Sequence, residues 1–266
     1  MNQKELSALI KNTAPDTDGY ITLRDLTLDT RSEWAARTNS RLKFINVNFN
    51  APVLGTFWTK PEFDGCVFSS CDLDGINAAK VTFTDTLFER TSMGKKLFNS
   101  FSKTLFRNCE FRGSFIGSTE FNKVTFENVH FIDTNVQKIN FTECTFENVT
   151  FTGTVKTVNF TGCTTRNTDL SKAFITDSVL ISGPGQDMKL PDVPGNFVAY
   201  PQAFRDVLRD MKDKLTPATY TELNSVVDFV SGSVHGEIVD PELFYSIHGK
   251  ERELILEKLF EYRNHK

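Results

Sequence analysis

A repeat of five residues runs through more than half of this 266-residue chain. In its most regular stretch, apolar residues stand at every fifth position from Phe121 through Phe126 and Phe131 to Phe151. An α-helix repeats every ~3.6 residues and a strand every two, so neither element alone explains the period. Fixed-length repeats predict units that stack and bury a shared core. The sequence therefore predicts a coiled chain that turns after each unit.

The register extends in both directions from this stretch. Its centres are residues 44, 49, 54, 58, 63, 68, 73, 78, 83, 88, 93, 98, 101, 106, 111, 116, 121, 126, 131, 136, 141, 146, 151, 155, 160, 165, 170, 175 and 180. Of the 25 Phe in the chain, 17 occupy these 29 positions, Phe98 among them. The spacing shortens to four at 54–58 and 151–155 and to three at 98–101. We take each short step as one full unit.

A second inward column, of small or β-branched residues, lies two positions before each centre. All five Cys belong to it. The predicted structural core includes Phe63, Phe68, Phe83, Phe88, Phe101, Phe106, Phe121, Phe126, Phe141, Phe146, Cys66, Cys71, Cys109, Cys144 and Cys163. Cys66 and Cys71 form a lone Cys-x4-Cys pair, which is not a zinc-site pattern. We expect the thiols to be reduced and to pack as small apolar groups.

The individual units resemble a known family. Residues 144–148 (CTFEN), 124–128 (VTFEN) and 149–153 (VTFTG) follow the pentapeptide-repeat pattern of small, polar, Phe or Leu, polar, polar. The resemblance covers about residues 42–182. It implies a mainly β fold, a right-handed quadrilateral β-helix with four units per coil. The 29 units then make about seven coils.

The repeat and its flanks predict four segments. Residues 1–41 are an N-terminal helix and cap, and 42–182 are the β-helix. Residues 183–200, with their Gly and Pro, are a linker, and 201–266 are a helical region with apolar residues at helical spacing. These C-terminal helices form a small bundle, dock on the rod or dimerise. The resemblance adds that many relatives dimerise through a C-terminal helix.

Outward apolar residues are the first candidates for a binding surface. If every step counts as one face, Val67, Leu87 and Leu105 form a stripe on one face, and Leu97 and Phe115 lie on another. Exposed apolar patches usually mark a contact. Two interpretations remain open: a terminal segment of the same chain covers the stripe, or a partner protein binds it.

A basic cluster surrounds the step at 98–101. It comprises Arg90, Lys95, Lys96, Lys103, Arg107 and Arg112. A bulge at this step would present Lys95 and Lys96 to an acidic partner. The alternative is a solvated corner whose charges point to different faces.

No pattern in the sequence indicates catalysis. The His residues lack metal-ligand spacing, the acidic residues are spread over solvated positions, and residues 183–185 lack the other elements of a phosphate loop. We predict a protein that is not an enzyme and uses no metal or cofactor. The N-terminus lacks a secretory signal and no run of 18 apolar residues occurs. We therefore expect a cytoplasmic protein without membrane contact.

Two functions are compatible with this sequence. The first is a non-catalytic scaffold that binds and modulates or neutralises a partner protein, as some bacterial and phage relatives do as immunity factors. The second comes from the resemblance: some pentapeptide-repeat proteins mimic DNA and bind DNA gyrase. Residues 42–183 carry 14 basic and 14 acidic residues, which disfavours mimicry. No segment is basic enough to predict direct nucleic-acid binding.

Overall fold

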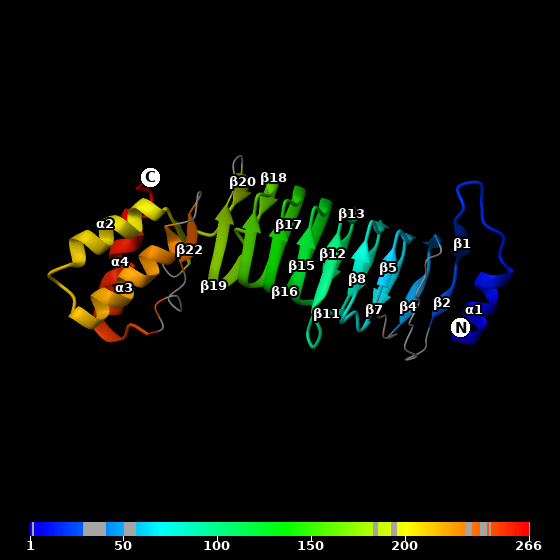
Figure 1. Cartoon of the computed structure of the whole chain (residues 1–266), viewed down its shortest axis with the longest axis horizontal. Helices are drawn as coiled ribbons and strands as arrows, with labels where there is room; N and C mark the ends of the chain where they lie inside the picture. The colour runs from blue at the N-terminus through cyan, green and yellow to red at the C-terminus, as the bar shows by residue number, and fades with distance from the viewer. Residues whose placement is uncertain are drawn as a thin grey trace.

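The structure is a computed structural model of the whole chain, with its termini at opposite ends of an elongated molecule (Figure 1). It describes residues 1, 3–28, 41–50, 57–182, 186–192, 196–231, 236–239, 244 and 246–265. The predicted centre Leu54 and the step at 54–58 lie partly outside these residues.

The helices are α1 (Gln3–Asn12), α2 (Pro201–Met211), α3 (Pro217–Val230) and α4 (Gly249–Tyr262). The strands are β1 (Ile21–Arg24), β2 (Thr27–Leu28), β3 (Leu42–Ile45), β4 (Asn48–Asn50), β5 (Phe57–Thr59), β6 (Glu62–Asp64), β7 (Val67–Ser69), β8 (Asn77–Ala79), β9 (Thr82–Thr84), β10 (Leu87–Glu89), β11 (Ser92–Met93), β12 (Asn99–Ser102), β13 (Leu105–Arg107), β14 (Glu110–Arg112), β15 (Phe115–Asn122), β16 (Thr125–Thr142), β17 (Thr145–Thr161), β18 (Thr164–Asp169), β19 (Ala173–Ser182), β20 (Gln186–Lys189), β21 (Phe197–Ala199) and β22 (Glu237–Val239).

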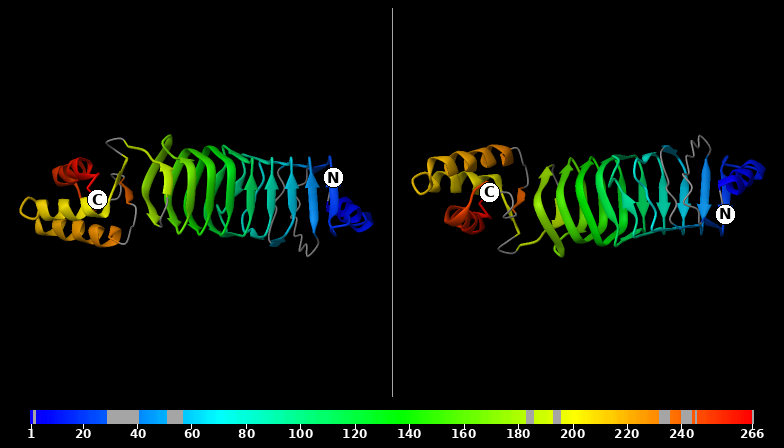
Figure 2. Two further views of the ribbon diagram at one scale, coloured as in Figure 1. Left: turned by 90° about the horizontal axis from the view of Figure 1, so that it is seen from above. Right: turned by 90° about the horizontal axis from the view of Figure 1, so that it is seen from below.

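The strands form a β-solenoid of about seven turns, which confirms the predicted fold. From β1 to β20, the strands pair in parallel with strands one turn away, as Phe126 does with Phe146. Because a unit has five residues, this 20-residue offset gives each turn four sides. Figure 2 shows the turns stacked along the rod. We name the sides by their inward centres. Side A contains Phe83, Phe106 and Phe126, side B Phe88, Phe111 and Phe131, side C Met93, Ile116 and Val136, and side D Ala78, Phe101 and Phe121.

The chain turns between sides by entering the left-handed backbone region. Among the described residues, 19 non-glycine residues have positive φ, and all of them lie in the solenoid. Asn and Asp tolerate this conformation better than most residues. Asn108, Asn128, Asn148 and Asn167 occupy successive corners after side A. Their amides bond from turn to turn, with 3.0 Å between Asn128 Nδ2 and Asn108 Oδ1. This ladder locks the corner and the register together.

The core consists of Phe rings stacked along the rod. On side A the ring centroids of Phe83 and Phe106 lie 4.8 Å apart, and those of Phe126 and Phe146 lie 5.0 Å apart. This spacing matches the ~4.8 Å between hydrogen-bonded strands. All ten Phe and five Cys of the predicted core are buried, each at most 3% exposed.

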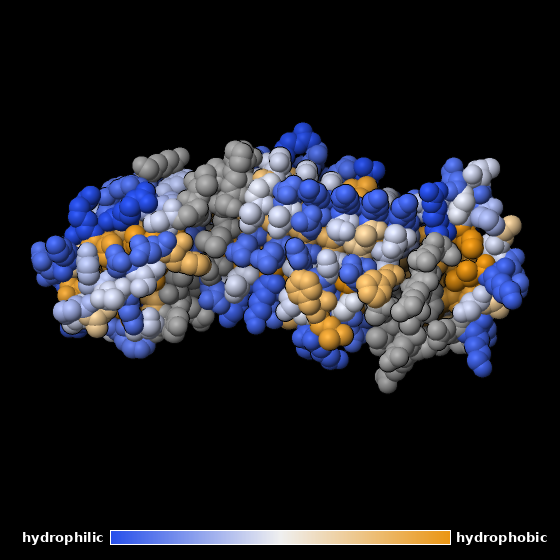
Figure 3. All heavy atoms as spheres, viewed as in Figure 1, coloured by the Kyte–Doolittle hydropathy of each residue, from blue (hydrophilic) through white to orange (hydrophobic). Residues whose placement is uncertain are grey.

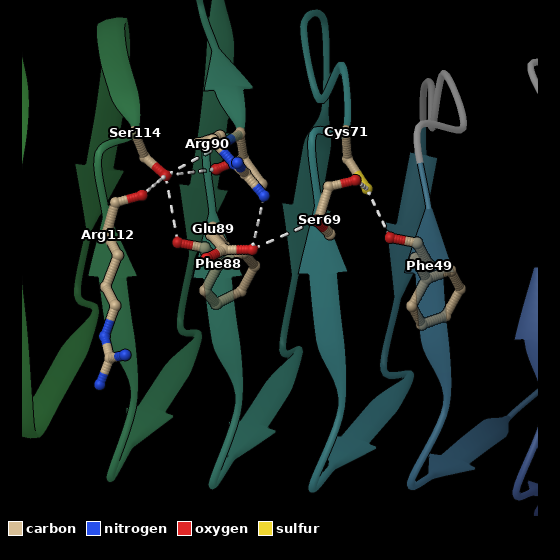
Figure 4. A network of polar contacts seen from close by, with 9 residues as sticks. Phe49, Ser69, Cys71, Phe88, Glu89, Arg90, Arg112 and Ser114 are labelled. Carbon is tan, nitrogen blue, oxygen red and sulfur yellow. Dashed lines mark hydrogen bonds and ion pairs between the residues drawn. The ribbon is translucent and has the colours of Figure 1, made fainter. Parts of the chain in front are cut away.

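The small inward residues satisfy backbone carbonyls of the preceding turn. Cys71 Sγ donates to the carbonyl of Phe49 at 3.1 Å, and Ser114 Oγ donates to that of Phe88 at 3.1 Å (Figure 4). Thr134 Oγ1 makes the same bond to Phe111 at 2.8 Å. Buried polar groups need such partners. The column is therefore restricted to side chains that are small and, in many turns, able to donate one hydrogen bond.

The short step at 151–155 is confirmed as a full unit. Val155 pairs with Val136 while Phe151 pairs with Phe131, and a register shift between them absorbs the missing residue. Gly153 lies at this shift with φ +95°, and a Cβ there would approach the carbonyl oxygen of Thr134 to 2.5 Å. The short step therefore requires glycine.

The step at 98–101 is wrong as a unit. Phe83 pairs with Phe106, and Phe101 pairs with Ala78, so Met93 and Phe101 are consecutive centres separated by eight residues. Five residues form a side and three loop out, because three residues are too few to form a side. Phe98, predicted as a core residue, is 59% exposed.

Asn99 and Ile181 are two further differences from the predicted register. Asn99 is fully buried two positions before Phe101, and its Oδ1 accepts a hydrogen bond from the Ile76 amide at 2.9 Å. Separately, one extra residue opposite Lys156–Val158 makes Ile181, not Leu180, the register partner of Phe160.

Both ends of the rod are covered. At the N-terminal end, α1 buries Leu6 against the core, and β1 pairs with β3, so the solenoid begins before residue 42 (Figure 1). At the other end, β22 pairs antiparallel with β19 of the last turn and with β21. Open sheet edges promote association between chains, and these elements cover part of the exposed edge at each end. Residues 183–200, expected as a linker, include β20, which pairs with β18, and β21.

Three C-terminal helices pack around a second core. α2 and α3 begin at Pro201 and Pro217, a favoured first position, and Thr216 Oγ1 accepts a hydrogen bond from the Thr219 amide. Their buried residues include Phe204, Leu223 and, from α4, Leu259. The helices thus bury most of their apolar residues within one chain, although Phe229 of α3 is 57% exposed.

We expect Phe126→Ala to lower the free energy of unfolding by about 3–5 kcal/mol, since it leaves a cavity between two stacked rings. Urea denaturation measures this change. The control is Phe98→Ala, which removes an exposed ring and should change stability by less than about 0.5 kcal/mol. Equal losses in both variants would contradict the corrected register.

We expect the native thiols to resist alkylation and disulfide reagents. Burial raises the pKa of the Cys66 thiol to about 11 and that of Cys109 to about 12. At pH 8 the reactive thiolate is then about 0.1% of Cys66 or less. Ellman's reagent should modify these two thiols at least 100-fold more slowly in the native protein than in guanidinium. Rapid native modification would show that the turns open readily.

Candidate functional site

The three extra residues produce a loop of residues 94–98 between β11 and β12. Asp74, 8% exposed at the end of side C one turn earlier, holds this loop. Its Oδ1 accepts a hydrogen bond from the Lys95 amide and its Oδ2 one from the Lys96 amide, both at 2.8 Å. Hydrogen bonds to a charged acceptor are stronger than neutral ones. The loop is therefore anchored at two consecutive amides.

Close packing fixes the loop further. Gly94 has φ +69°, and a Cβ there would lie 1.6 Å from the carbonyl oxygen of Gly117 in the next turn. The Leu97 side chain lies over Gly75, where a Cβ would come within 3.1 Å of Leu97 Cδ1. Lys96 Nζ lies 3.5 Å from Asp72 Oδ2. The loop is thus held between the turn before it and the turn after it.

This anchored loop exposes two large apolar side chains. Leu97 is 60% exposed and Phe98 is 59% exposed. Figure 3 shows apolar surface in the lower middle of the rod, where Figure 1 places the loop after β11. We call residues 94–98 the apolar loop. It is a rigid apolar projection from a mostly polar rod.

The predicted stripe does not exist as one surface. Leu87 pairs with Val67 on side B, but Leu105 pairs with Thr82 on side A. All three side chains are half-buried. The prediction of the stripe counted the step at 98–101 as one unit. That count assigned every residue after the step to the wrong side. Phe115 is half-buried on side C, with its ring against Gly117.

The predicted basic cluster is dispersed over several sides. Arg90 pairs with Glu89, Arg107 with Glu127 and Arg112 with Glu110. Of the six residues, Lys95 and Lys96 alone lie on the apolar loop, and both are exposed. The bulge predicted at this step is present, and it carries apolar residues beside the two Lys.

The pattern of repeats did not indicate the role of Asp74 or the exposure of Phe98. The length of the step was the available signal. Four residues can form one side if the register shifts locally, but three residues are too few to span a side. Taking 93–101 as one unit with an insertion would have placed residues 94–98 in a loop.

The residues that the structure describes contain no group of three or more His, Cys, Asp or Glu side chains arranged to hold a metal ion. Within the same residues, no helix is long and apolar enough to span a membrane.

The five-residue repeat, the four-sided turn and the alternation of small and large inward residues define the pentapeptide-repeat fold, and the chain has this fold. No family model matches the sequence, and no curated protein matches it either.

Several solved structures are similar to it at low identity. QnrB1, a plasmid-mediated fluoroquinolone resistance protein, is 16% identical over 65% of this chain and 87% of its own, with a TM-score of 0.32. HetL, a pentapeptide-repeat protein involved in heterocyst differentiation regulation in the cyanobacterium Nostoc, is 11% identical over 71% of this chain and 95% of its own, with a TM-score of 0.25. ORF18 of Geobacillus virus E2 is 10% identical over 74% and 62%, with a TM-score of 0.23.

We expect Asp74→Ala to free the apolar loop without unfolding the rod. Amide hydrogen exchange at Lys95 and Lys96 should become at least tenfold faster, because both amides lose their acceptor. The matched control is Lys96→Ala, which removes the exposed ion pair to Asp72 but keeps both amide bonds. Its exchange should remain close to that of the wild type. Equal acceleration in both variants would show that Asp74 does not hold the loop.

Proposed function

We propose that this chain is a non-catalytic scaffold that binds a partner protein through the apolar loop. The observation that carries the proposal is the exposure of Leu97 and Phe98 on a loop fixed by Asp74. Large apolar side chains that are exposed together usually mark an interaction site.

The energetics of the loop suit a binding anchor. Because Leu97 and Phe98 are 60% and 59% exposed, burying their remaining surface contributes roughly 2–4 kcal/mol in total. A few such anchors carry most of the energy of a protein interface. Because the loop is already held at two amides, binding does not have to order it first. A partner with an apolar pocket would therefore gain most of this burial energy.

We further propose that binding modulates or neutralises the partner, in the manner of an immunity protein. The support is the rigidity of the rod, which holds the loop in one orientation and could block a partner surface. Most apolar residues of the C-terminal helices are buried within one chain, with Phe229 as an exposed exception, and this burial favours a capping role for them over a dimer contact.

The charge pattern gives little support to the alternative, a DNA mimic that binds gyrase. Acidic residues of the rod share columns with basic ones, as in the side A column of Arg107, Glu127, Glu147 and Arg166. Arg107 pairs with Glu127, and Arg166 pairs with Glu147. A phosphate-like surface would need these acidic groups to be unpaired.

An affinity capture from the native host tests the proposal, with wild type and Leu97→Asp/Phe98→Asp as baits. We expect a specific partner that the double variant loses, because charge at the loop prevents apolar burial. Phe174→Asp, which alters another exposed Phe on side C, is the matched control and should retain the partner.

Circular dichroism confirms that each bait is folded. A partner retained by the folded double variant would move the binding site away from the loop. Capture of gyrase subunits, together with inhibition of supercoiling, would favour the alternative function.

A further inference from the structure

Lysine occupies the same corner in four consecutive turns. Lys60, Lys80, Lys103 and Lys123 each follow side D by two residues and have φ between 51° and 62°. Their amides bond in register to the next turn, from Lys60 to Ala79, Lys80 to Ser102 and Lys103 to Asn122. We call these four residues the basic ridge. Successive turns place their charges about 4.8 Å apart at the backbone.

This arrangement is unfavourable for folding. Lysine gains nothing from the left-handed conformation, which Asn, Asp and Gly accept more readily. The corner after side A uses such residues, including Asp85, Asn108 and Asn128. Like charges directly opposite one another on neighbouring strands also destabilise a sheet. Residues whose conformation and charge are unfavourable for folding, with no compensating contact, are typical of functional sites.

The ridge is largely unneutralised. Lys123 Nζ lies 3.3 Å from Glu143 Oε2 at the next turn. Within the described part of the chain, Lys60, Lys80 and Lys103 make no ion pair, whereas Lys43, Lys96, Lys156 and Lys189 each do. Lys80 and Lys103 are exposed. The ridge therefore presents positive charge to the solvent along a straight line.

Side D joins the ridge to the apolar loop. The chain leaves the loop at Phe98, crosses side D as β12 and reaches Lys103 at the opposite corner. In the turns of Lys80 and Lys103, the outward residues between the two margins are uncharged, namely Asn77, Ala79, Ser100 and Ser102. Phe57 lies beside them one turn earlier and Glu120 one turn later. A partner seated on side D would touch apolar groups at one margin and lysines at the other.

We propose that the basic ridge binds an acidic segment of the partner protein. This deepens the proposed function and rests on it, since it assigns the partner's chemistry. Charge complementarity favours a row of carboxylates along the ridge. A protein fits better than a nucleic acid because the adjoining margin is apolar and the rod as a whole has no net positive charge, with 14 basic and 14 acidic residues at 42–183.

A titration with a synthetic decaglutamate peptide tests the ridge directly. Amide shifts of the isotope-labelled full chain, recorded by NMR at low salt, report the site and the affinity. We expect shifts at the four lysines and at least a fivefold weaker affinity for Lys80→Glu/Lys103→Glu. Glutamate is tolerated at this corner, since Glu143 occupies it one turn later with φ 51°.

The matched control is Lys138→Glu/Lys172→Glu, which changes the net charge equally at exposed positions away from the ridge. Its affinity should stay within twofold of the wild type. An equal loss in the control, or shifts spread over the whole rod, would reduce the effect to net charge and overturn the proposal. Stronger binding of oligothymidine at the same amides would also overturn it and assign a nucleic acid.

The experiments distinguish a failure of the basic-ridge proposal from a failure of the apolar-loop proposal. The peptide has no apolar residue, so absence of binding rejects the acidic ligand and leaves the capture experiment with Leu97→Asp/Phe98→Asp unaffected. Conversely, a partner that ignores the apolar loop but binds through the ridge would be lost by Lys80→Glu/Lys103→Glu alone.

Discussion

The structure depends on the in-register stacking of one turn on the next. Parallel hydrogen bonding sets the turns about 4.8 Å apart, and this distance suits face-to-face Phe rings, as between Phe88 and Phe111 at 4.5 Å. Backbone and side chains therefore impose the same repeat. A residue out of register on one side would displace every ring above it, so any irregularity must be resolved within its own turn.

The two large irregularities are resolved in opposite ways. A missing residue at 151–155 is absorbed by a register shift at Gly153, with no change at the surface. Three extra residues after Met93 cannot enter the core, so they are expelled as the apolar loop, and Asp74 and Asn99 bond to the backbone around it. An insertion is thus one way in which a solenoid of this kind can project apolar side chains, in addition to outward strand positions such as Phe174.

The sequence contained enough to predict the fold, because the period of five and the inward pattern leave few alternatives. The surface was harder to predict, since the side on which a residue lies depends on every step before it. One misjudged step at 98–101 moved Leu105 from side A to side B and made a stripe from residues on two sides. The roles of Asp74 and Asn99 depend on contacts between turns, which spacing alone does not reveal.

The corners explain how a rod with no net charge can still concentrate charge of one sign along a line. Each corner is a column of one residue per turn, so similar residues in that column add their effects along a line. Asn in one column forms a ladder that stabilises the rod, whereas Lys in another forms a ridge that does not. The net charge of the rod sums over all columns, so it does not reveal a column that carries charge of one sign. In a solenoid, therefore, the informative electrostatic quantity is the charge of each column, read at the period of the turn.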